Sequence, residues 1–262
     1  MLIDTHSHIY EPEFDADRAE VVARAVKTGV GLMLLPAIDV QSDARMFATC
    51  REYPETTVPM MGLHPTSVND NAEWGSELDR VESYLAQPPQ GIARFCGVGE
   101  IGLDFYWSSD FAAAQTEAFA SQIELAIKYD LPIEVHTRNA WPQMRDIVRS
   151  FRGRGLRGVF HAFSENAECY RELLKYGDFM FGIGGVVTFK KSAVADTVRE
   201  MSLDDIVLET DCPYLTPVPN RGKRNEPAYL GFIRDKVADL QGVTPDEVAA
   251  RTTANARKMF GL

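Results

Sequence analysis

Short apolar runs alternate with longer amphipathic stretches along the whole chain, about eight times, with a repeat of roughly 30 residues. Several of these runs are unbroken, which is typical of parallel strands that are buried on both faces. The pattern predicts strands at Leu2–Thr5, Val30–Pro36, Thr57–Leu63, Phe95–Glu100, Pro132–His136, Gly158–His161, Phe179–Gly182 and Ile206–Thr210.

Between these runs, apolar residues recur every three or four positions, as they do on one face of a helix. Asn139 is the expected N-cap of one helix, and Gly242 is the expected end of another. The last helix should begin at Thr244, because Thr-Pro-Asp-Glu has the form of a capping box with proline at the first helical position. The clearest apolar stripes are Trp74, Leu78, Val81 and Leu85; Trp141, Met144, Ile147 and Phe151; and Tyr229, Ile233, Val237 and Leu240.

Strands and helices that alternate in this way predict an α/β fold, a closed (β/α)8 TIM barrel that forms one domain over residues 1–262. A doubly wound sheet is the alternative, but no glycine-rich phosphate-binding motif follows the first strand. A chain of this length buries enough surface to fold without disulfides or a structural metal.

Composition narrows the possible functions. The chain has 27 Lys and Arg against 38 Asp and Glu, a net charge of −11. This charge argues against broad, non-specific binding of duplex nucleic acid, but not against a nuclease that grips one strand end. The longest apolar run, Val30–Ile38, is too short to span a membrane, and the N-terminus lacks the pattern of a secretory signal. Four cysteines without a CxxC motif favour a cytoplasmic location, and no feature indicates an obligate protein partner.

All five histidines fall at or just after the ends of predicted strands, on the face where a TIM barrel builds its active site. His6 and His8 are two residues apart, so both point to the same side of the first strand. His136 and His161 end two neighbouring strands, and His64 ends the third strand. A lone histidine of this kind is more often a core residue satisfied by the backbone, but a set of five at one end of a barrel favours a shared site.

Two carboxylates are expected at the same end of the barrel. Glu100 ends the fourth predicted strand, and Asp211 follows the eighth, which neighbours the first once the barrel closes. Glu100 could instead pair with an arginine such as Arg138. Nitrogen and oxygen donors without thiolates suit Zn, Mn, Co or Mg, and six of them exceed what one catalytic ion uses. Two divalent ions bridged by Glu100 would activate a water, which predicts a metal-dependent hydrolase.

The segment after the eighth strand, Leu208–Pro227, carries a local cationic cluster of Arg221, Lys223 and Arg224. Guanidinium and ammonium groups match phosphate oxygens well. The cluster, with Arg138, is therefore predicted to bind substrate phosphate. A solvated basic loop is the other interpretation.

The motifs DTHSH, GLHP, GEIGLD, HTR, HAFS and LETDCPYLTPVPNRGKRNEP, with NARKMFGL at the C-terminus, resemble the TatD family of metal-dependent deoxyribonucleases, which are amidohydrolase-type TIM barrels. The resemblance implies cytoplasmic hydrolysis of DNA by 3′-to-5′ exonuclease action on single strands. It also implies a set of metal ligands that matches the residues found from the strand ends: His6, His8, Glu100, His136, His161 and Asp211.

On this hypothesis Glu100 holds both ions, Asp211 orients or deprotonates the attacking water, and His64 grips phosphate or acts as an acid. The substrate would be a single-stranded DNA end or another phosphodiester. Two other functions stay open: metal-dependent hydrolysis of an amide, ester or lactone, and a non-catalytic metal-binding scaffold. Many carbonyl-directed relatives bridge their metals with a modified lysine on the fourth strand, so a glutamate at this place favours phosphate.

Overall fold

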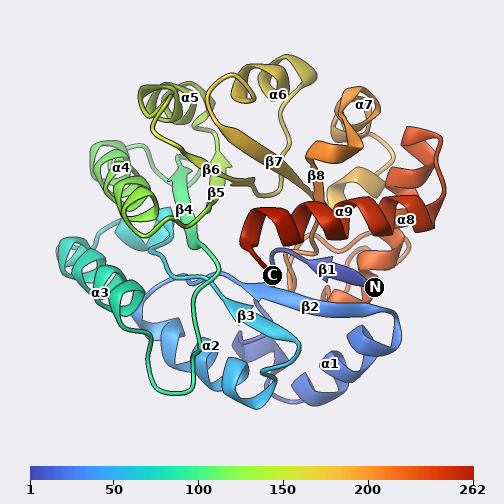
Figure 1. Cartoon of the computed structure of the whole chain (residues 1–262), viewed down its shortest axis with the longest axis horizontal. Helices are drawn as coiled ribbons and strands as arrows, with labels where there is room; N and C mark the ends of the chain where they lie inside the picture. Colours follow the sequence, from blue (N-terminus) through green and yellow to red (C-terminus); the bar gives the residue numbers. More distant parts are fainter.

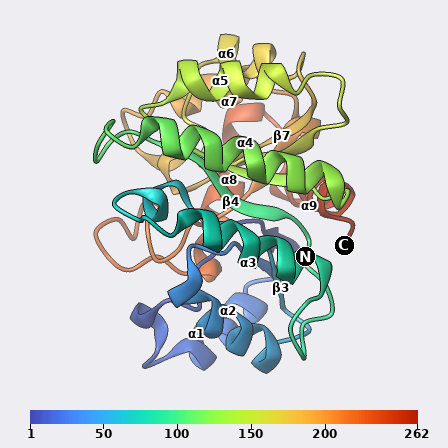
Figure 2. The same ribbon diagram turned by 90° about the vertical axis from the view of Figure 1, so that its left-hand side faces the viewer.

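The computed structural model describes residues 1–262 and has eight parallel strands, each followed along the chain by a helix (Figure 1). The strands are β1 (Leu2–Asp4), β2 (Val30–Leu35), β3 (Thr57–Pro59), β4 (Val98–Asp104), β5 (Ile133–Arg138), β6 (Arg157–Phe160), β7 (Asp178–Ile183) and β8 (Ile206–Leu208). The helices that follow them are α1 (Arg18–Lys27), α2 (Val40–Glu52), α3 (Trp74–Ala86), α4 (Ala112–Lys128), α5 (Trp141–Ser150), α6 (Ala167–Leu173), α7 (Val194–Glu200) and α8 (Leu230–Gln241). The predicted (β/α)8 architecture is confirmed, and Figure 2 shows α1 to α6 following one another along the outside of the barrel.

The barrel closes through irregular pairing. Ladder hydrogen bonds join β1 to β3 into one sheet and β4 to β8 into another. Two isolated parallel bridges connect these sheets, between Met61 and Val98 on one side and between Ser7 and Cys212 on the other. Next to the second bridge, the N–H of Asp211 donates to the carbonyl of His6 at 2.9 Å. The segments that follow β1 and β8 therefore lie side by side, although about 200 residues separate them in the chain.

Strand β4 differs from its predicted position. It runs over Val98–Asp104 and not over Phe95–Glu100, so Glu100 lies inside the strand and not at its end. The strand continues because its last residues pair with the end of β5, with Gly102 opposite His136 and Asp104 opposite Arg138. The predicted strand ends at Glu100 because a charged residue interrupts the apolar run there, although Ile101 and Leu103 continue it.

The predicted helix ends are confirmed at two places and wrong at one. Gly242 ends α8 with a left-handed backbone (φ 67°), a conformation that glycine adopts without strain. The side chain of Thr244 accepts the N–H of Glu247 and so caps the next helix. Asn139 is not the N-cap of α5, because Ala140 holds that position and Asn139 adopts a positive φ of 54°.

A ninth helix, α9 (Pro245–Phe260), lies across one end of the barrel (Figure 1). Its residues Ala256, Met259 and Phe260 form an apolar cluster with residues from seven of the strands or their flanks: Ile3, Leu34, Met60, Cys96, Val159, Met180 and Val207. This cluster fills the end at which the strands begin, so a site is available only at the opposite end. No helix combines the length and the apolar character needed to cross a membrane.

Candidate metal centre

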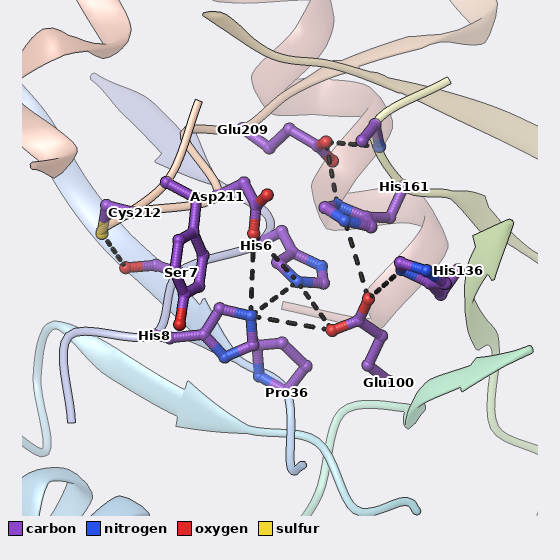
Figure 3. Close-up of polar contacts among 12 residues, drawn as sticks. His6, Ser7, His8, Pro36, Glu100, His136, His161, Glu209, Asp211 and Cys212 are labelled. Carbon is purple, nitrogen blue, oxygen red and sulfur yellow. Dashed lines mark hydrogen bonds and ion pairs between the residues drawn. The ribbon is translucent and has the colours of Figure 1, made fainter. Parts of the chain in front are cut away.

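The six predicted ligands converge where the strands end (Figure 3). They come from five parts of the barrel: His6 and His8 after β1, Glu100 within β4, His136 within β5, His161 after β6, and Asp211 after β8. All of them are at least largely buried, and Glu100 is only 3% exposed. A carboxylate is not stable at such a depth unless a positive charge and hydrogen bonds compensate it.

The two oxygens of Glu100 face two different groups of imidazoles. Its Oε2 lies 3.2 Å from His6 Nε2 and 3.6 Å from His8 Nε2. Its Oε1 faces three other ring nitrogens, His136 Nδ1 at 2.9 Å, His64 Nε2 at 3.4 Å and His161 Nε2 at 3.6 Å. Glu100 therefore contacts both halves of the cluster. His161 also approaches the first half, because its ring stacks on that of His6 with centroids 3.6 Å apart.

The first group has the spacing of a metal site. His6 Nε2 and His8 Nε2 are 3.0 Å apart, and each lies 3.7 Å from Asp211 Oδ1. Four ligands placed about 2.0–2.2 Å from an ion in a tetrahedron are separated by about 3.4 Å. The donor atoms of His6, His8 and Glu100 thus have the chemistry and the mutual proximity of a divalent-cation site, and Asp211 lies beside both histidines.

Charges in this group are strongly coupled. Burial lowers the pKa of His6, but the negative charge of Glu100 and hydrogen bonds to Glu100 and Glu134 outweigh it and hold this pKa well above its usual value. Burial and the positive charge of His6 hold the pKa of His8 well below its usual value. Burial raises the pKa of Glu100, yet the neighbouring imidazoles, His64 first among them, keep it well below the usual value. Glu100 is therefore an anion balanced by His6.

Tyr10 determines which nitrogen of His8 faces the centre. The Tyr10 hydroxyl donates to the carbonyl of Pro36 at 2.6 Å and lies 2.9 Å from His8 Nδ1. Since the hydroxyl proton is already used, Tyr10 accepts a hydrogen bond from Nδ1–H of His8. The lone pair of His8 Nε2 is then directed at the centre, as a metal ligand requires.

The second group surrounds the other oxygen of Glu100. His136 lies between two carboxylates, with Nδ1 2.9 Å from Glu100 Oε1 and Nε2 3.0 Å from Asp104 Oδ2. Burial lowers the pKa of His136, but the hydrogen bonds to Asp104 and Glu100 raise it to about 9. Burial and the charge of His6 lower the pKa of His161 to about 3, so this imidazole is neutral. An ion in this group would take the place of the proton that His136 holds.

His64 belongs to this second group. From the sequence it had no evident metal partner, yet its Nε2 lies 3.4 Å from Glu100 Oε1 and its ring centroid 4.7 Å from that of His136. Its Nδ1 is occupied by Thr66, lying 2.6 Å from the side-chain oxygen and 3.2 Å from the N–H. Because Nδ1 accepts the N–H of Thr66, Nε2 carries the ring proton and faces Glu100 as a donor, so His64 is a hydrogen-bond donor beside the six predicted ligands.

Comparisons with known proteins identify the family to which the chain belongs. The family described as TatD related DNase matches residues 3–261. The chain belongs to this family. It is 35% identical to the uncharacterized metal-dependent hydrolase YabD of Bacillus subtilis, with all of both chains covered. It is 30% identical to a protein of Citrobacter rodentium named 3′-5′ ssDNA/RNA exonuclease TatD, covering all of this chain and 98% of that one.

Among solved structures, the TatD homologue YJJV from Escherichia coli K12 superimposes with a TM-score of 0.89 at 26% identity, over all of this chain and 98% of that one. The protein is thus a TatD-family metal-dependent hydrolase with the barrel fold of that family. The clusters of His, Glu and Asp described above agree with binding of a divalent metal.

Two fully buried glutamates beneath this TatD-family centre were not found from the sequence. Glu134 Oε1 lies 3.2 Å from His6 Nδ1. Glu209 Oε1 lies 3.0 Å from His161 Nδ1 (Figure 3). Burial raises the pKa of Glu134 to about 8 and that of Glu209 to about 7. A carboxylate on the far nitrogen of an imidazole sets the orientation of the ring, so these residues position the two histidines.

The spacing of two residues from a predicted ligand was the sequence pattern that could have revealed these glutamates. Glu134 precedes His136 by two residues, and Glu209 precedes Asp211 by two, so each pair points to the barrel interior. Glycines make the space for them. A Cβ at residue 182 would lie 1.9 Å from Glu209 Oε2, and a Cβ at residue 99 would lie 2.5 Å from Glu134 Cβ.

A cleft of about 650 Å³ opens above the centre. Its wall includes most of the predicted site residues, namely His8, His64, Glu100, His136, Arg138, His161 and Asp211. The side chain of Asp211 is 13% exposed against 4% for Glu100, so Asp211 is the more exposed of these two carboxylates.

The basic side chains that were predicted to bind phosphate do not lie together in the structure. Arg138 lines the cleft and makes no ion pair with Glu100, so that alternative for Glu100 is wrong. The cluster of Arg221, Lys223 and Arg224 does not line the cleft. Arg224 donates to both carboxylate oxygens of Asp17, at 2.8 and 2.7 Å, and Arg221 lies over the ring of Phe189. The structure therefore gives no support to a phosphate-binding role for Arg224. These contacts join residues far apart in the chain, which is why sequence reasoning did not find them.

Proposed function

We propose that the protein hydrolyses phosphodiester bonds of DNA, acting as a 3′-to-5′ exonuclease on single strands with two divalent cations, Mg, Zn or Mn. The observation that carries the proposal is the position of Glu100, whose two oxygens face separate groups of imidazoles. When bound, a pair of ions would lower the pKa of a coordinated water and neutralise charge on the phosphate oxygens.

Each part of the cluster has a distinct role in this proposal. His6, His8, Asp211 and Oε2 of Glu100 would hold one ion. Oε1 of Glu100 would hold the other with His136 and His161. His64, whose Nε2 carries a proton, would grip a phosphate oxygen or act as an acid. Of the two carboxylate ligands that line the cleft, Asp211 is the more exposed, so it would orient the attacking water and accept its proton.

Asp4 supports Asp211 in this role. The carboxylate of Asp4 is fully buried and accepts both the N–H and the hydroxyl of Thr210, at 2.8 and 2.6 Å. Thr210 immediately precedes Asp211, so these two hydrogen bonds fix the backbone that carries the proposed base.

Recognition of the substrate's charge falls to Arg138. It is the one lysine or arginine that lines the cleft, and its guanidinium matches two phosphate oxygens at once. Arg221 and Lys223 lie outside the lining and would reach only the phosphates of a strand that extends beyond the cleft. The low number of cations agrees with the net charge of −11 and with binding of a strand end instead of a long duplex.

The comparisons support this choice over a carbonyl substrate. The Citrobacter rodentium relative is named for exonuclease action on single-stranded DNA and RNA, and the family description names a DNase. A glutamate in β4, where many carbonyl-directed relatives have a modified lysine, agrees with this. We also infer a cytoplasmic location, because all four cysteines are free thiols buried in the fold.

The test compares substrates and variants. Purified protein is assayed with Mg, Mn and Zn on end-labelled single strands of DNA and RNA, on duplex DNA, and on p-nitrophenyl esters and lactones. We expect shortening from the 3′ end of single strands. Glu100→Gln should lower kcat by about a thousandfold, since it weakens both ion sites at once, and should lower the bound metal measured by elemental analysis.

Glu117→Gln makes the same change on the exposed face of α4 and is the matched control. Rapid ester or lactone hydrolysis without any cleavage of DNA would contradict the proposal. So would a Glu100→Gln protein with the turnover and metal content of the control.

A further inference from the structure

Two large aromatic side chains stand exposed in the loop after β4. Tyr106 is 51% exposed and Trp107 is 70% exposed, the largest value among the exposed large hydrophobic residues. Each ring leaves a large apolar area in contact with water. Burial of such an area lowers the free energy, so a ligand that covers the rings would gain affinity. Adjacent exposed aromatics beside an active-site cleft are typical of a surface that a ligand covers.

The two rings and Arg138 form one unit, which we call the aromatic shelf (Tyr106, Trp107 and Arg138). The rings are perpendicular, with centroids 4.9 Å apart and an angle of 87° between them. The guanidinium carbon of Arg138 lies 3.6 Å from the ring centroid of Tyr106 and 5.9 Å from that of Trp107. Stacking orients this guanidinium, while its N–H groups make no ion pair within the chain and are available to an anion.

Asp104 connects the aromatic shelf to the metal centre. Its Oδ2 lies 3.0 Å from His136 Nε2, and its Oδ1 accepts the N–H of Tyr106 at 2.9 Å. The carbonyl of Arg138 accepts the N–H of Phe105 at 2.9 Å. Trp107 and Arg138 both line the cleft that contains Glu100. The shelf is therefore held in a defined place, one side chain away from a candidate ligand.

We propose that the aromatic shelf binds a nucleobase of the substrate strand, next to the phosphodiester that is cleaved. The inference rests on the proposed function and extends it with a subsite. A base has a π-face that stacks on Trp107, and its phosphate is an anion that Arg138 binds. Stacking of this kind accepts every base and needs a base that is free of its partner strand. The shelf thus accounts for a preference for single strands without a preference for sequence.

The experiment removes a base from the substrate and the indole from the protein. The substrates are end-labelled dT10 and three versions of it, each with one abasic tetrahydrofuran residue at the first, second or third position from the 3′ end. For the wild type, we expect the abasic residue at one of these positions to lower kcat/KM by about tenfold. In Trp107→Ala the KM for dT10 should rise by a similar factor, and the cost of the abasic residue should disappear.

Two variants serve as controls. Trp107→Phe keeps an aromatic face and should keep most of the discrimination between dT10 and the abasic strand. Phe232→Ala removes another exposed aromatic ring, on α8 and outside the cleft lining, and should keep the wild-type ratio. Binding is read independently of cleavage in the Glu100→Gln protein, where dT10 should quench tryptophan fluorescence and the added Trp107→Ala change should abolish the quenching.

The inference is overturned if no abasic position affects the wild type, or if the cost survives in Trp107→Ala. A wild type that cleaves no DNA would refute the proposed function, and the fluorescence titration would then decide the shelf separately. Quenching that depends on Trp107 supports the shelf, and titration with dT10 that leaves the fluorescence unchanged overturns it.

Discussion

The space that Gly182 leaves for Glu209 leads to a quantitative prediction. In Gly182→Ala the new Cβ would lie 1.9 Å from Glu209 Oε2 and 2.6 Å from its Cδ, far inside van der Waals contact. Glu209 cannot move without loss, because its Oε1 accepts the N–H of Ala162 at 2.6 Å and lies 3.0 Å from His161 Nδ1. Gly182 itself has a backbone that alanine can adopt, so the clash is the only cause of destabilisation.

The magnitude follows from the two ways to relieve this clash. If Glu209 stays, an extra carbon in a packed interior costs about 1–3 kcal/mol of strain. If Glu209 rotates away, the partly buried N–H of Ala162 loses its acceptor, which also costs about 1–3 kcal/mol. We therefore expect Gly182→Ala to lower the free energy of unfolding by about 2 kcal/mol. We also expect metal affinity to fall by roughly 10–100-fold, because His161 loses the carboxylate that orients it.

Urea unfolding in excess chelator measures stability without a contribution from bound metal. A titration with Co²⁺, followed by its absorption spectrum, measures affinity. Gly231→Ala is the matched control, since a Cβ there meets nothing within 4 Å. In the double variant Gly182→Ala with Glu209→Asp, the shorter side chain leaves room for the new carbon. Its loss of stability should be smaller than the sum of the two single losses by about 1 kcal/mol or more.

Two results would refute this reasoning. One is a Gly182→Ala protein as stable as Gly231→Ala. The other is a double variant whose loss equals the sum of the single losses within about 0.5 kcal/mol, because additivity would show that the two side chains do not compete for the same space.

Three further predictions concern the site, the barrel end and the pH dependence. Tyr10→Phe removes the acceptor of His8 Nδ1–H and should weaken Co²⁺ binding about tenfold; unchanged affinity would contradict the assigned tautomer. Phe260→Ala should lower the free energy of unfolding by about 3–5 kcal/mol in urea while Co²⁺ affinity is kept, since the cavity lies at the far end of the barrel. Hydrogen bonds from Arg224 lower the pKa of Asp17, so their stabilisation is present above the unfolded pKa of about 3.9 and is lost as the pH falls below it. Arg224→Ala should therefore be about 1 kcal/mol less stable at pH 7, a value discounted for partial exposure, and the difference should become smaller near pH 2, where only the contacts of Arg224 with Glu13 and Phe14 are lost; a constant difference would contradict the pairing.

The pattern of residues along the chain determined where the strands lie and which ends of them carry chemistry. Apolar runs located all eight strands, because strands buried on both faces need apolar residues at nearly every position. His6, His8 and Asp211 were placed at one end of the barrel for a similar reason. Parallel strands all end at the same edge, so a residue at a strand end has a defined place once the topology is known.

Some features of the centre were decided by contacts between distant strands. The division of Glu100 between two groups of imidazoles depends on the side-chain directions of five segments. The continuation of β4 through Asp104 depends on pairing with β5, and the burial of Glu209 depends on the glycine at residue 182 of the neighbouring strand.

The same limit explains the basic loop. The cluster of positive charge in the sequence predicted that Arg224 binds phosphate. In the folded chain Asp17, which is about 200 residues away in sequence, lies beside Arg224 and accepts its hydrogen bonds. A local pattern specifies the direction of a side chain relative to its own strand or helix, because backbone geometry repeats. The partner of that side chain is specified only when the barrel closes, since closure brings together groups that no local pattern connects.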